Sequence, residues 1–148
     1  MNKDSRMHKL VVFCSLIFAV ASFLHATDSM TSHGTSTVVY FIPFQVETYI
    51  PVTPETIVDQ AWEKWSISAK RGSNRLLAIL SHGHGSAFDK NRVRALVIAG
   101  GKRYLIDTNG VVLSQSKESQ GTVIDKRVFM EFRDSLRADQ RQVLRREK

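Results

Sequence analysis

Cysteine is almost absent from this 148-residue chain, since Cys14 is the only one. A single cysteine forms no internal disulfide. Small exported domains are usually stabilised by such crosslinks, so packing alone must stabilise the folded part of this chain. The chain also lacks a Gly-x-Ser-x-Gly elbow, a phosphate-binding loop and a His-Glu-x-x-His pair. We therefore predict that the protein is not an enzyme, and the sequence indicates no metal site and no cofactor.

Residues 1–26 have the form of a secretory signal peptide. Basic residues precede an uncharged run from Leu10 to Leu24, and small residues follow it. We expect cleavage after Ala21 or after Ala26. The run is shorter than the roughly 20 residues that span a bilayer, so we expect membrane contact only through the cleaved leader. The predicted location is periplasmic or secreted, which disfavours nucleic acid as a partner.

The remaining chain is long enough for one domain. Removing Lys3, Arg6, Lys9 and Asp4 with the leader lowers the formal net charge from +7 to +5. A moderately basic surface favours an acidic protein partner. Residues 27–36 are rich in Thr, Ser and Gly and predict a flexible lead-in, so the single α+β domain is expected over 37–148.

The first half of that domain predicts a strand and two helices. Residues 38–50 are rich in β-branched and aromatic side chains, and Pro43 indicates a bulge or an edge strand. Thr53-Pro54-Glu55 resembles a helix start, which predicts a helix over 54–68 with Trp62 and Trp65 on one buried face. Residues 76–80 fit a helix or a strand, and the helix is favoured because Ser73 would cap it and Gly83 would end it.

The second half gives the clearest signals. Three strand-like segments, 93–99, 102–108 and 111–114, are separated by Gly100-Gly101 and Asn109-Gly110, which predict tight turns in an antiparallel meander. A polar loop is expected over 116–121 and a helix from Asp125 onward. The predicted fold class is therefore α+β, with an antiparallel sheet of about four strands (the N-terminal strand plus the meander) and helices packed on one face.

Residues 76–85 carry the first candidate site. The sequence Leu-Leu-Ala-Ile-Leu-Ser-His-Gly-His-Gly resembles the hydrophobic strand and Ser-His-Gly segment of caspase-like cysteine proteases, which implies a nucleophilic cysteine on a later strand. No cysteine follows Cys14. His82 and His84 are instead predicted to contact a partner from a glycine-rich loop. A metal site there would need further ligands, for which His33 and Asp89 are the candidates.

Four arginines form the second candidate site. Arg133, Arg137, Arg141 and Arg145 are spaced by four, which predicts a stripe along one side of a terminal helix. Such a stripe is either a solvated helix face or a docking surface for an acidic partner, and a basic helix on anionic lipid is a further alternative. The partner-binding residues predicted from the sequence are thus His82, His84 and these arginines.

These observations predict an exported binding or inhibitor protein, for example an immunity protein that neutralises an envelope-targeted toxin or wall-degrading enzyme. One alternative is a small envelope hydrolase acting on peptidoglycan or another glycan, which would need two carboxyls in a cleft. Glu47, Asp89, Asp107 and Glu118 are available, although Asp107 has the simpler role of stabilising the Asn109-Gly110 turn. The other alternative is a solute-binding or envelope-stabilising domain with a pocket lined by tryptophan.

Overall fold

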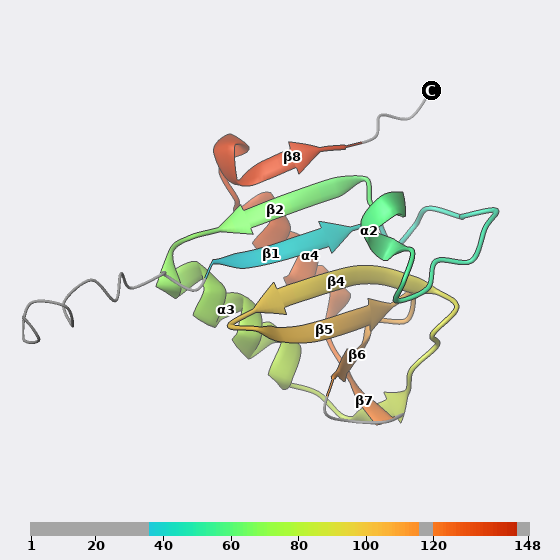
Figure 1. Cartoon of the computed structure of the whole chain (residues 1–148). Coiled ribbons are helices and arrows are strands. Elements are labelled where there is room, and N and C mark those ends of the chain that lie inside the picture. The colour runs from blue at the N-terminus through green and yellow to red at the C-terminus, as the bar shows by residue number, and fades with distance from the viewer. Residues whose placement is uncertain (1–35, 116–119, 145–148) are drawn as a thin grey trace, which may run out of the picture. The chain divides into compact units, whose positions relative to one another are not determined.

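The computed structural model describes residues 36–115 and 120–144, which form one eight-stranded antiparallel sheet with three helices (Figure 1). The strand order is β3-β7-β6-β5-β4-β1-β2-β8. The strands are β1 (Thr37–Phe41), β2 (Glu63–Ile67), β3 (Gly85–Ala87), β4 (Val93–Ala99), β5 (Lys102–Asp107), β6 (Val111–Ser114), β7 (Gln120–Val123) and β8 (Arg141–Val143). The helices are α2 (Ile57–Gln60), α3 (Lys70–Ser81) and α4 (Lys126–Asp134), followed by a 3-10 turn, η1 (Ala138–Gln140).

Two apolar clusters lie on opposite faces of the sheet. The larger one joins α3 and α4 to inward side chains of the strands, among them Phe41, Trp65 and Ile106. The smaller one joins Ile57 of α2 to Leu96 of β4. The prediction of helices on one face only was therefore wrong. Within the described ranges, no helix is long and apolar enough to cross a membrane.

The α+β class was right, but the expected four-stranded sheet was wrong, because β2, β3, β7 and β8 were not foreseen. The largest error concerns residues 54–68, where a helix was predicted. Only the four residues of α2 are helical, and Glu63–Ile67 is a strand. Trp65 is fully buried in the larger cluster, whereas Trp62 packs against the smaller one. The two tryptophans therefore do not share a face.

The first strand is shorter than predicted and lies inside the sheet. It ends at Phe41, two residues before Pro43, and pairs with β4 on one side and β2 on the other. Proline has no N–H to donate to a ladder, so the strand stops before Pro43. The edge position that Pro43 indicated was wrong.

The meander and both longer helices agree with the sequence prediction. Gly100 and Gly101 have φ angles of 56° and 76°, as a tight hairpin with two left-handed residues requires. The carboxylate of Asp107 accepts hydrogen bonds from the N–H groups of Asn109 and Val111 at 2.8 and 2.9 Å, which confirms its structural role. Residues 76–80 are helical, but α3 begins at Lys70, so Ser73 lies inside the helix and does not cap it.

The C-terminal helix begins where it was expected. Asp125 caps α4 by accepting a hydrogen bond from the N–H of Arg127 at 2.8 Å. The helix ends at Asp134, and the chain continues into η1 and β8. The predicted leader, nearly all of the lead-in, Glu118 and Arg145 lie outside the described residues.

Candidate functional site

A groove lies between the C-terminal half of α3 and strands β5, β6 and β7. Its volume is about 450 Å³, which falls within the range of about 300 to 1,000 Å³ typical of small-molecule pockets. The helix and the three strands form its walls. Its lining residues are Leu77, Ala78, Leu80, Ser81, Tyr104, Val112, Ser114 and Thr122.

The lining combines apolar and hydroxyl side chains and contains no charged group. Tyr104 and Ser114 are partners across β5 and β6, and Thr122 is the partner of Val112 across β6 and β7. These positions therefore point to the same face of the sheet, toward α3. Apolar walls with a few convergent polar groups favour an uncharged or amphipathic ligand group.

The sequence analysis missed the strand side of this groove. The available signal was the occurrence of Tyr104, Ser114 and Thr122 on the sheet face that packs against a helix. Such positions usually carry aliphatic side chains. Recognising the signal required the register of β5, β6 and β7, and β7 was not predicted.

His82 directly follows the helix whose last residue, Ser81, lines the groove. Its ring Nδ1 lies 2.6 Å from the carbonyl oxygen of Ala78 and 3.3 Å from the hydroxyl of Ser81. A carbonyl oxygen only accepts, so a hydrogen bond at this contact requires a proton on Nδ1. Ser81 in turn donates to the same carbonyl at 3.0 Å. Because Nδ1 carries a proton, His82 cannot activate Ser81 through this contact, and the two do not form a nucleophile–base pair.

Gly83 and His84 connect α3 to the edge of the sheet. A Cβ atom at Gly83 would overlap the carbonyl oxygen of Val123, so only glycine fits against β7 here. The N–H of Val123 donates to the carbonyl of His84 at 2.9 Å. Both predicted histidines are exposed and lie beside one end of the groove.

A metal site at these histidines finds no support among residues 36–115 and 120–144, where no group of three or more His, Cys, Asp or Glu side chains could hold a metal ion. Asp89 accepts a hydrogen bond from the N–H of Asn91 at 3.0 Å, which places it in a turn. His33 lies outside the described residues.

The predicted arginine stripe does not exist as a helix face. Arg133 lies in α4, Arg137 precedes η1, and Arg141 begins β8. The helix ends at Asp134, so the spacing of four no longer places the arginine side chains along one face. Arg137 is exposed and pairs with Asp139 at 2.9 Å. Partner binding by these arginines stays a prediction, but its expected geometry was wrong.

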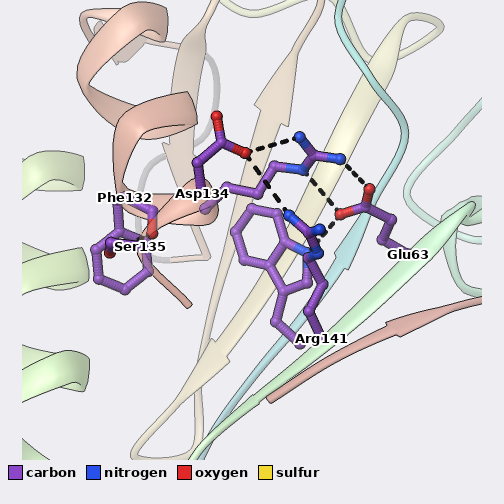
Figure 2. Close-up of polar contacts among 7 residues, drawn as sticks. Glu63, Phe132, Asp134, Ser135 and Arg141 are labelled. Atoms are coloured by element: carbon purple, nitrogen blue, oxygen red, sulfur yellow. Dashed lines mark hydrogen bonds and ion pairs between the residues drawn. The ribbon is translucent and has the colours of Figure 1, made fainter. Parts of the chain in front are cut away.

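Arg133 and Arg141 take part in a partly buried ion-pair network instead (Figure 2). Glu63 is 6% exposed and accepts hydrogen bonds from Arg133 and from the indole N–H of Trp65, the latter at 2.9 Å. The Oδ1 atom of Asp134 forms ion pairs with Nη1 of Arg133 at 3.0 Å and with Nη1 of Arg141 at 3.6 Å. The network joins β2 to α4 and β8.

Opposing effects set the pKa of Glu63. Burial by itself would raise it, but the hydrogen bonds from Arg133 and Trp65 and the charges of Arg133 and Arg141 lower the pKa below its ordinary value. The hydrogen bond to Glu63 raises the pKa of Arg133 in return. The carboxylate has donors on both oxygens, so we assign the network a structural role.

Comparisons with protein-family models, with curated proteins and with solved structures found no match to this chain.

Proposed function

We propose that this protein is an exported binding or inhibitor protein that engages its partner through the groove beneath α3 and the adjoining His82–His84 segment. The groove carries this proposal, because it is concave, combines apolar with hydroxyl side chains and is bordered by exposed histidines. The signal-like residues 1–26 and the positive net charge support export and an acidic partner. An immunity protein that neutralises an envelope-targeted toxin or wall-degrading enzyme is one member of this class.

The groove supports binding better than glycan hydrolysis. A glycosidase of the usual kind needs two carboxyls across its cleft, and none lines this groove. A second hollow, of about 270 Å³, is lined on the other face of the sheet by Pro54, Glu55, Arg103, Leu105, Leu113, Ser114 and Gln115. It presents one carboxyl, Glu55. Neither of these two hollows therefore offers the pair.

Binding of a small solute is the second candidate, and the volume of the groove favours it. Trp65 is completely buried and neither tryptophan lines either of these two hollows, so the tryptophan-lined pocket that this alternative assumed has no support in them. Such a solute would contact Tyr104 and the neighbouring hydroxyls instead.

Affinity capture with a groove-blocking variant tests the proposal. Ala78→Arg places a long side chain at an exposed helical position that lines the groove, while Asn74→Arg makes the same charge change one turn earlier outside it. We expect wild type and Asn74→Arg to retain the same specific protein from an envelope extract and Ala78→Arg to lose it. Equal capture by all three proteins would refute the groove as the binding site. A small molecule retained in place of a protein would favour solute binding.

A further inference from the structure

Arg94 is a buried cation without a carboxylate partner. The residue is 4% exposed, and no ion pair of the described residues includes it. Its Nη1 donates to the carbonyl of Val93 and its Nη2 to the carbonyl of Val46, both at 3.1 Å. Its Nε is buried and has no hydrogen-bond partner.

This arrangement is unfavourable by itself. Arginine is almost never fully buried unless it is paired, and two neutral carbonyls do not neutralise a guanidinium. Burial lowers the pKa of Arg94, and the charge of Arg92 lowers it further, yet arginine keeps its proton in proteins. The site therefore has an excess of positive charge that an anionic group would relieve.

A long loop joins β1 to α2 (Figure 1). The carbonyl of Val46 in this loop accepts a hydrogen bond from Arg94, and the loop exposes the apolar side chains of Tyr49 and Ile50 to solvent. We define the arch as residues 45–51, between β1 and α2. One end of the arch is held by the bond from Arg94 to Val46. Beyond its other end, the carbonyl of Val52 accepts the N–H of Val93 at 2.9 Å. At the tip, Tyr49 is fully exposed and Ile50 is 68% exposed.

The arch and Arg94 offer the residue types that dominate protein interfaces. Tyrosine and arginine are enriched among the side chains that contribute most to binding. Lys90 and Arg92 are exposed just before β4, whereas Glu47 is the acidic residue of the arch. Asp89 precedes Lys90, and Glu55 lies close enough to Lys90 to interact with its charge. The buried charge that has no carboxylate partner among the described residues is therefore that of Arg94 itself, and the arch exposes apolar surface at Tyr49 and Ile50.

We propose that the arch and Arg94 form a docking surface for an acidic segment of another protein, in which a carboxylate binds the unused N–H groups of Arg94 while an adjacent apolar side chain packs on Tyr49 and Ile50. This surface deepens the proposed function, and it rests on the chain's being a binding protein. Arg94 supplies a positive charge for an acidic group of the partner, which the uncharged groove does not offer. The arch shifts to admit the carboxylate, because the guanidinium is covered in the free protein.

The test titrates the purified protein with a short capped peptide of glutamate and leucine, and with a lysine–leucine peptide as its control. Backbone amide NMR shifts of the arch report binding. We expect the acidic peptide to bind more weakly as salt is added, and Arg94→Gln to weaken it at least about tenfold, as truncating a buried charge contact does. Arg127→Gln, which removes a mostly exposed arginine on α4, is the matched control and leaves the affinity unchanged.

Two further variants keep the test decisive. Tyr49→Ser alters a fully exposed side chain, so it leaves folding intact and weakens peptide binding even where Arg94→Gln fails to fold. Ala78→Arg in the groove leaves peptide binding unchanged, which separates this surface from the groove. No binding by wild type, or equal binding by wild type and Tyr49→Ser, would overturn the docking surface while leaving the affinity-capture result for the groove in place.

Discussion

At the residue scale, Trp65 is the largest fully buried side chain of the described residues and lies in the larger cluster. It is fully buried, its ring centroid lies 5.2 Å from that of Phe41 and 5.4 Å from that of Phe129, and its indole N–H donates to Glu63. We expect Trp65→Ala to lower the free energy of unfolding by about 3 to 5 kcal/mol, measured by urea denaturation. Trp62→Ala is the comparison and should cost less, because Trp62 is half-buried in the smaller cluster. Equal costs would contradict the different burial of the two tryptophans.

Glu63 makes the stability depend on pH. Its pKa is lowered in the folded protein, so its contribution is fully present above the ordinary value of about 4.5 and is lost as the pH falls through the folded pKa. We expect the urea concentration at the unfolding midpoint of the wild type to decrease as the solution is acidified below about pH 4.5. Glu63→Gln should be less stable than wild type at pH 7 and should lose less stability on acidification, since the amide does not titrate. Parallel midpoint curves for the two proteins would rule out the network as the cause.

At the scale of elements, β2 shows why the sequence prediction failed where it did. In a strand, Glu63, Trp65 and Ile67 share one face, but a buried glutamate breaks the apolar alternation that marks a half-buried strand. The spacing of Trp62 and Trp65 then fits a helix equally well. The carboxylate is accommodated because Arg133 reaches it from α4, a residue 70 positions away, which no local pattern reveals.

The β4–β5 hairpin was predictable because its signal is local. Both turn glycines have left-handed φ angles, which residues with a Cβ adopt at a cost of about 1–2 kcal/mol. We expect Gly101→Ala to reduce the free energy of unfolding by about 1 kcal/mol. Gly100→Asn should cost much less, because asparagine tolerates this conformation. Since nothing lies within 4 Å of a Cβ at either position, a steric clash does not contribute to the urea midpoints of the two variants. Similar losses for both would contradict this interpretation of the turn.

At the scale of the whole molecule, the sequence could predict which residues were available to a site but not which of them meet. The histidines lie beside the groove only because α3 ends where β7 approaches Gly83. The arginines separate because α4 ends at Asp134. In the sequence, nothing distinguishes Arg94 from other strand residues. It becomes a candidate binding residue only because its side chain is buried and no carboxylate of the described residues pairs with it. Each of these features is set by contacts between distant segments.

Export concerns the whole chain and is the last prediction. The basic start, uncharged run and small residues of 1–26 predict a protein that is translocated and shortened. Expressed with its own N-terminus in a bacterial host, the protein should be recovered from the periplasm or the medium, with a mass that corresponds to a start at Ser22 or Thr27. Intact-mass measurement of each cell fraction checks this. A matched variant in which Leu16 and Val20 are replaced by Asp interrupts the uncharged run and should remain full-length in the cytoplasm. Recovery of the wild-type chain at full length in the cytoplasm would remove the basis for an envelope partner, while the groove and the arch could still be tested with cytoplasmic ligands.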